Sequence, residues 1–208
     1  MSKKINILKR FIIYMAILTF VMFTVWAFVK SFLNRPAGDY ETEVCDIRLK
    51  DKKFNEALIA ANKALDKTPN HRGAIMCKAL VFISEKKYYE ATLELNYLID
   101  FLKENIEDDD KTGIGTLAAA YANRGIIKDR QKNHKGALED YVKALGIDHE
   151  AVAGPGLGTV ILNYKYKSSS VRERALYLND QLQLPDDERV LSIQELDEGQ
   201  VMHKPGKL

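Results

Sequence analysis

Cysteine is almost absent from this chain, which contains only Cys45 and Cys77. Two cysteines are too few for a disulfide-rich scaffold, and no further cysteine or paired histidine lies at the spacing of a zinc site. Two interpretations of the pair stay open. Cys45 and Cys77 are either buried thiols that act as small apolar residues, or one disulfide formed in an oxidising compartment.

The sequence also lacks the motifs of common catalytic sites. No His-Glu-x-x-His or Gly-x-Ser-x-Gly occurs, and the four histidines are predicted to be solvated or to cap helices. The glycines of residues 154–158 are not followed by Gly-Lys-Ser/Thr, so they predict a turn and not a phosphate loop. The four acids of residues 107–110 lack the ligand spacing of a calcium loop and predict a solvated loop. We therefore expect no catalytic activity, metal or cofactor.

Long apolar runs are absent too, with one exception. Residues 11–29 form an unbroken stretch of nineteen residues without a charge. As a helix this stretch would be roughly 28 Å long, which matches the hydrocarbon core of a bilayer. The sequence therefore predicts a transmembrane helix over residues 11–30.

The charges around this run predict its orientation. Basic residues before the run outnumber those close behind it, which favours a cytoplasmic N-terminus and a C-terminal part across the membrane. In a Gram-negative bacterium that part would be periplasmic, on an inner-membrane anchor. The basic residues before the run are Lys3, Lys4, Lys9 and Arg10.

The alternative is a cleavable signal peptide, with Val25-Trp26-Ala27 as the cleavage site and Phe28 as the first mature residue. The apolar run is longer than the usual apolar region of such a peptide, so the anchor is favoured. On the anchor itself, five residues share an arc of roughly 80°, and the small ones among them would let another helix approach. This predicted contact face comprises Ile12, Ala16, Thr19, Phe23 and Ala27.

About 178 residues follow the run, enough for one domain with a core. They contain 27 Lys and Arg against 29 Asp and Glu, without a basic stripe, so nucleic acid is not an expected partner. Three segments share one helical pattern, in which apolar residues follow an alanine at four, seven and eight positions. Their leading alanines are Ala57, Ala91 and Ala137. The first two lie 34 residues apart and the last two 46, which indicates a 12-residue insertion around residues 104–116.

An upstream helix precedes each of these segments, over residues 42–49, 74–84 and 117–129. The small residues Cys45, Ala79 and Gly125 lie where the two helices of each hairpin would touch. A helix-turn-helix period of 34 residues with these small residues and an Ala-Leu pair resembles the tetratricopeptide repeat. A degenerate fourth unit is expected over residues 157–167 and 171–183, with an N-cap serine among residues 168–170.

The resemblance implies an all-α fold in which a single transmembrane helix precedes a solenoid of helical hairpins. The expected organisation is a cytoplasmic tail (1–10), the transmembrane helix (11–30), a linker (31–37), the repeat domain (38–185) and a C-terminal tail (186–208). The last dozen or so residues are expected to be extended or disordered.

The resemblance also implies that the first helices line a concave face that binds a peptide or a helix of a protein partner. We expect a non-enzymatic, membrane-anchored scaffold or accessory subunit that contacts the bilayer through its helix and a membrane protein complex through its groove. A periplasmic assembly factor or chaperone is the alternative. Whether a partner or the chain's own insertion or tail covers the groove stays open. The expected groove residues are Thr42, Asp46, Lys50, Met76, Leu80, Ile83, Ala122, Asn123, Ile126 and Arg130.

Overall fold

The computed structural model describes residues 2–33, 35–150, 152, 170–193, 200 and 202–203. Within these ranges the chain is built from α-helices and one short 3-10 helix, η1, without a strand, which confirms the predicted all-α class. The elements are α1 (Ser2–Leu33), α2 (Asp39–Lys50), α3 (Phe54–Lys67), α4 (Arg72–Ser84), α5 (Tyr88–Asn105), α6 (Lys111–Arg130), α7 (His134–Ile147), α9 (Val171–Leu182) and η1 (Asp186–Glu188). The predicted first helix of the fourth unit, 157–167, lies outside the described residues.

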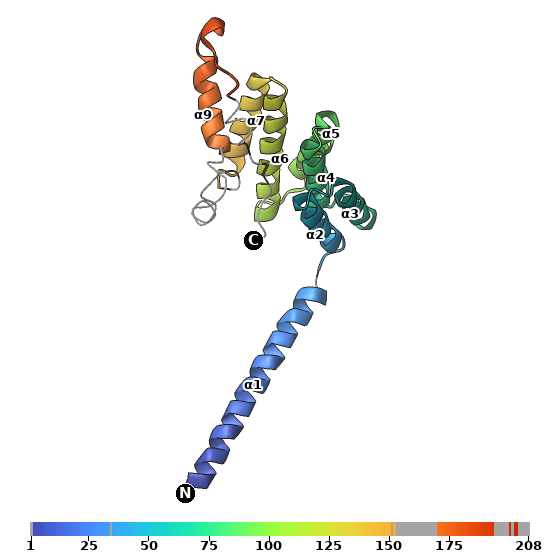
Figure 1. Cartoon of the computed structure of the whole chain (residues 1–208), viewed down its shortest axis with the longest axis vertical. Coiled ribbons are helices and arrows are strands. Elements are labelled where there is room, and N and C mark those ends of the chain that lie inside the picture. Colours follow the sequence, from blue (N-terminus) through green and yellow to red (C-terminus); the bar gives the residue numbers. More distant parts are fainter. Residues whose placement is uncertain are drawn as a thin grey trace.

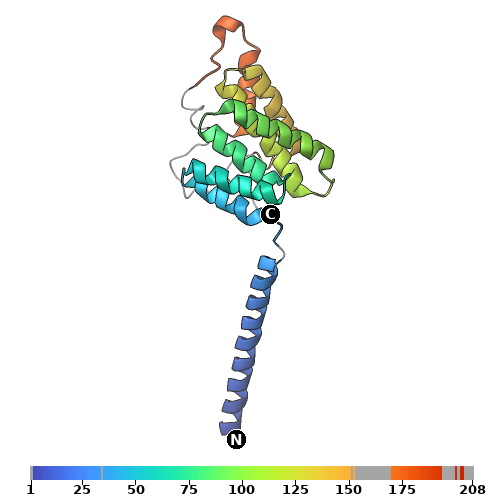
Figure 2. The same cartoon turned by 90° about the vertical axis from the view of Figure 1, so that its right-hand side faces the viewer.

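Helix α1 stands apart from the other helices (Figures 1 and 2). It extends beyond the apolar run at both ends, and the stretch from Ile7 to Lys30 is long and apolar enough to cross a membrane. None of that stretch is buried inside the protein. The predicted contact face is therefore exposed, and the Thr19 hydroxyl on it donates to the Met15 carbonyl oxygen, 2.8 Å away within the same helix.

Helices α2 to α7 pair as antiparallel hairpins, α2 with α3, α4 with α5 and α6 with α7, and each hairpin packs on the next (Figure 1). The small residues predicted at the hairpin contacts are buried there, and a Cβ added to Gly125 would come within 2.6 Å of the Tyr141 ring. The repeat alanines Ala57, Ala91 and Ala137 are fully buried. Close approach of the two helices therefore explains why small residues recur at these positions.

The turns within the three hairpins have the same backbone conformation. Lys52, Lys86 and Lys132 each adopt a left-handed conformation, with φ of 59°, 59° and 64°. In the second turn the Lys86 N–H donates to the Ile83 carbonyl and the Lys87 N–H to the Phe82 carbonyl, and the other turns repeat this pair of bonds. These bonds satisfy carbonyl groups at the end of the first helix of each hairpin. The 34- and 46-residue spacings of the sequence recur in these lysines.

Glycine in place of Lys86 is expected to stabilise the domain by about 0.5–1 kcal/mol. A left-handed conformation is strained for a residue with a Cβ, and glycine removes that strain at some cost in unfolded-state entropy. Chemical denaturation would measure the change. Glycine at the exposed, helical Lys63 of α3 should have the opposite sign, with a loss of about 1 kcal/mol. Equal effects of both variants would contradict the explanation.

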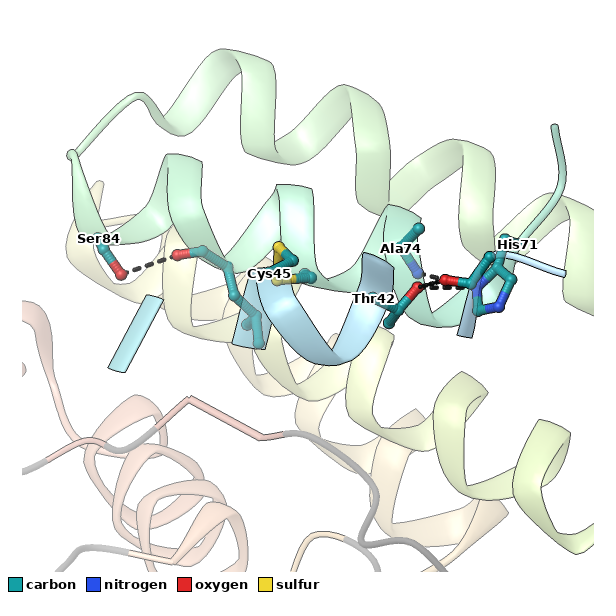
Figure 3. The surroundings of a disulfide bond; sticks show 8 residues. Thr42, Cys45, His71, Ala74 and Ser84 are labelled. Carbon is teal, nitrogen blue, oxygen red and sulfur yellow. Dashed lines mark hydrogen bonds between the residues drawn. A yellow bond between two sulfur atoms is a disulfide. The ribbon is translucent and has the colours of Figure 1, made fainter. Parts of the chain in front are cut away.

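Cys45 and Cys77 form a disulfide in the structure. Of the two interpretations of the pair, buried thiols or a disulfide, the structure therefore shows the second. The bond joins α2 to α4, with 6.4 Å between the two Cα atoms (Figure 3). At one end of the same helix pair, the His71 ring caps α4 by accepting from the Ala74 N–H at 3.2 Å. The first two hairpins are thus held together by a covalent bond as well as by packing.

The 12-residue insertion is not a loop of residues 104–116. It lengthens α5 and α6 to 18 and 20 residues, and only residues 106–110 connect the two helices. Asp110 is not simply solvated either, because its side chain accepts from the Gly113 N–H and pairs with Arg72 of α4. These two bonds hold the pKa of Asp110 below its ordinary value. A carboxylate at a helix N-terminus supplies a cap and complements the helix dipole, which explains why the helix begins there.

Helix α9 packs on α7, and it begins with the predicted cap. The Ser170 hydroxyl accepts from the Glu173 N–H at 3.2 Å, while the Glu173 carboxylate accepts from the Ser170 N–H, which makes a complete capping box. Ala175 and Leu178 are buried on one face of α9. Arg174 is buried on that face as well.

Candidate interaction groove

The residues predicted to line an open groove are mostly buried in the structure. Lys50 and Arg130 are exposed and Asp46 is half-buried. Met76, Leu80 and Ile83 belong to the main hydrophobic core, so in this structure the chain itself covers them, which is one of the two alternatives that the sequence left open. Met202, near the C-terminus, packs against the same core. The other buried members are Thr42, Ala122, Asn123 and Ile126.

Residues near the C-terminus cover part of this face. We call Gln200, Met202 and His203 the groove segment. The Asn123 Nδ2 donates to the His203 carbonyl oxygen at 2.6 Å, and the His203 N–H donates to the Asn123 Oδ1 at 2.8 Å. Met202 packs against the core, and His203 is 8% exposed. Apolar contact and two hydrogen bonds to the main chain of His203 therefore fix these non-helical residues on the groove face.

A buried carboxylate ties the groove segment to three helices. Asp129 of α6 accepts from Arg174 Nε of α9 at 2.7 Å and from the Gln200 side-chain amide at 2.9 Å. His134 Nδ1 and the Tyr141 hydroxyl of α7 lie 2.8 and 3.3 Å from its two oxygens. Asp129 is thus the common partner of α7, α9 and the C-terminal residues.

The charges in this cluster are held in their ionised forms. Burial by itself raises the pKa of Asp129, but the bonds from Arg174, Gln200 and His134 outweigh it and leave that pKa below its ordinary value. Burial raises the pKa of Tyr141 well above its ordinary value, and the neighbouring Asp129 carboxylate adds to the rise. The Asp129–Arg174 pair therefore stays charged and the tyrosine stays neutral at physiological pH.

A cavity of about 290 Å³ opens beside Gln200, the first residue of the groove segment. Arg130 and Lys132 add positive charge to its wall, next to the Asp129 carboxylate. Its lining residues are Tyr88, Asp129, Arg130, Lys132, Ser192 and Gln200. Arg130 is thus the predicted groove residue that remains accessible beside the cluster.

Acidification is expected to loosen the groove segment. Burial lowers the pKa of His203 from 6.5 to about 4. Among the described residues that line the small cavity around its ring, Tyr141 and Arg174 are titratable and neither is a carboxylate. Because the docked state binds the proton more weakly, docking is fully stable above pH 6.5 and weakens as pH falls from 6.5 to about 4. At pH 5 the free-to-docked ratio should rise roughly 30-fold.

Amide hydrogen exchange at residues 202–203, corrected for intrinsic rates, would measure this release. His203→Phe removes the titrating group, so its protection should not change between pH 7 and pH 5 beyond the correction. A wild-type chain whose protection is constant over this range would contradict the assignment to His203.

Sequence reasoning predicted Asn123 but missed four other residues of this site: Asp129, Arg174, Gln200 and His203. For Arg174 a signal existed, because it lies four residues before Leu178 and so shares its apolar helix face. A charged residue on such a face requires a buried partner. No comparable pattern marked Gln200 or His203, because their contacts lie 59–80 residues away in the sequence.

Solved structures of known proteins include chains that are similar to this one. No protein family and no curated protein matches the sequence. The chain is similar to the TPR domain of OM64 from Arabidopsis, with 18% sequence identity and a TM-score of 0.45. The match covers 55% of this chain and 84% of that domain. By its own residues and contacts, this chain is an all-α stack of helical hairpins behind an apolar N-terminal helix.

Proposed function

We propose that this protein is a non-enzymatic, membrane-anchored scaffold or accessory subunit that binds a polypeptide on the concave side of its hairpin stack. The observation that carries the proposal is the way in which Asn123 binds the groove segment. Asn123 engages the N–H and the carbonyl of one residue, and neither group belongs to a particular side chain. A site that binds main-chain groups in this way is suited to a protein partner.

The proposed location is the periplasmic side of a bacterial inner membrane. An exposed apolar helix of this length supports an anchor, and the basic residues before it support a cytoplasmic N-terminus. The Cys45–Cys77 disulfide supports an oxidising compartment for the hairpins. The α1 face that contains Ala16, Thr19 and Ala27 remains a predicted contact with another transmembrane helix.

Topology is tested on the full-length chain in intact cells and spheroplasts. We expect carbonate-resistant membrane association, digestion of the hairpin domain only when protease reaches the periplasm, and an uncleaved N-terminus. A mature chain that begins at Phe28 would show that α1 is a signal peptide. Digestion of the domain only after cell lysis would place it in the cytoplasm.

Partner binding is tested by purifying the tagged full-length protein in mild detergent and identifying bound proteins by mass spectrometry. Asn123→Ala and Arg130→Glu should each reduce recovery of the partner at least tenfold, while the chain keeps its helical circular dichroism. Val142→Asp is the matched surface control, because Val142 is 57% exposed on α7, and it should leave recovery unchanged. Partner recovery that is equal in all folded variants would argue against the groove.

A further inference from the structure

The groove segment suggests how the site selects its partner. A residue in the interior of a helix uses its own N–H and carbonyl in the helix ladder, so it cannot give both to a side chain. Asn123 takes both groups of His203. An occupant of this seat is therefore non-helical at that position, which favours an extended peptide over an amphipathic helix.

Each described residue of the groove segment meets a different chemical environment. The Gln200 amide donates to Asp129 at 2.9 Å, so this position requires a hydrogen-bond donor, and an acidic side chain would face a carboxylate. Met202 packs on the hydrophobic core. The small cavity around the buried His203 ring is lined by Ile126 and Val171 and also by the Arg174 guanidinium. Burial next to a cation disfavours a positive charge, so this position favours an uncharged ring.

We propose that the groove segment is a competitor held in cis, and that it yields its place to a non-helical segment of a protein partner with the same chemistry. That segment has a hydrogen-bond donor at the position of Gln200, an apolar side chain at that of Met202 and an uncharged one at that of His203. The proposal rests on the proposed function and adds the class of sequence that the site accepts. A competitor on the same chain acts at a high effective concentration, so a partner must bind well enough to displace it.

The experiment uses the full-length protein in detergent micelles and a labelled synthetic peptide of residues 197–206. The variant Met202→Asp/His203→Lys puts one charge into the core contact and a cation beside the buried Arg174, and it should empty the site. We expect this variant to bind the peptide at least tenfold more tightly than the wild-type chain. Val142→Asp is the charge control on α7 and should bind like the wild type. Equal affinity of the emptied variant and the wild type would overturn the proposal.

The peptide itself tests the predicted chemistry. A peptide with Gln200→Glu should bind the emptied variant at least tenfold more weakly, whereas Gln200→Arg should retain binding. Asn123→Ala, added to the emptied variant, should abolish binding of the wild-type peptide. Indifference to the Glu substitution, or to the loss of Asn123, would overturn the assignment of these contacts.

Two further measurements cover the cases in which the variant does not fold or the segment comes from a second copy of the chain. If the emptied variant does not fold by circular dichroism, amide exchange at residues 202–203 in wild type and in Asn123→Ala replaces it. Faster exchange in Asn123→Ala supports the seat, and unchanged exchange overturns it. If the wild-type chain binds the peptide with an affinity that varies with protein concentration, the segment comes from a second copy, and the cis competitor is wrong.

The outcomes separate this inference from the proposed function. Suppose that the peptide binds as described, but the pull-down recovers no partner whose binding depends on the groove residues. That result would contradict the proposed function and still support the cis competitor. Suppose instead that partner recovery depends on the groove residues, while peptide affinity is the same with Gln200→Glu and in the emptied variant. That result would support the proposed function and contradict the cis competitor.

Discussion

Replacing Asp129 with alanine is expected to lower the free energy of unfolding by about 3–5 kcal/mol, the cost typical of breaking a buried ion pair. Asp129 is 6% exposed and Arg174 is 2% exposed, so the guanidinium left behind cannot recover its lost partner from water. The substitution also removes the acceptor of the Gln200 amide. We therefore expect α9 and the groove segment to loosen together. Chemical denaturation and amide exchange would measure both effects.

The matched control is Asp66→Ala in α3, because Asp66 is an exposed carboxylate. Its change in stability should stay within about 0.5 kcal/mol. A double-mutant cycle with Arg174→Met should give a coupling energy of roughly 0.5–3 kcal/mol between Asp129 and Arg174. Additive single effects would mean that the two side chains do not act as a pair.

Loss of the Cys45–Cys77 disulfide is the second large effect. The bond closes a loop with a sequence separation of 32 residues, and cross-links of this span typically contribute about 3–4 kcal/mol by limiting the unfolded chain. The double variant Cys45→Ala/Cys77→Ala should lose that amount. It should also free α2 and α3 to unfold before the later hairpins, because the bond joins the first hairpin to α4.

Reductant provides the control for this prediction. The wild-type chain in excess dithiothreitol should unfold at the same denaturant concentration as the double variant, and reductant should not affect the double variant. Wild-type stability that is independent of reductant would contradict a stabilising disulfide. A free-thiol assay on protein taken from the membrane fraction would show whether the bond forms in the cell.

The hairpins were predictable because their signals are local. Apolar side chains recur with the helical period, and a small residue marks each place where the paired helices touch, as Gly125 does against Tyr141. The insertion was predicted at the right place but in the wrong form. Residues 111–116 extend α6 because Asp110 caps the helix start, a tertiary choice that also uses Arg72 of the neighbouring hairpin.

The groove shows where prediction from local pattern stops. Periodicity placed Met76, Leu80 and Ile83 on a first helix, but whether that face is open depends on which distant residues pack on the core, and Met202 is one of them. Asn123 was among the expected groove residues. That it binds the main chain of His203 could not be predicted, because His203 lies 80 residues away in the sequence. His203 was expected in solvent or in a helix cap and lies instead in a cavity between helices.

The sequence by itself determined an apolar N-terminal helix and a succession of helical hairpins, because both follow from side chains spaced within one or two helical turns. The tertiary structure alone decided that Cys45 meets Cys77, that Asp129 binds Arg174 and Gln200, and that Asn123 binds His203. Those contacts join residues 32 to 80 positions apart. They depend on how the hairpins stack, and no pattern within a single helix encodes that geometry.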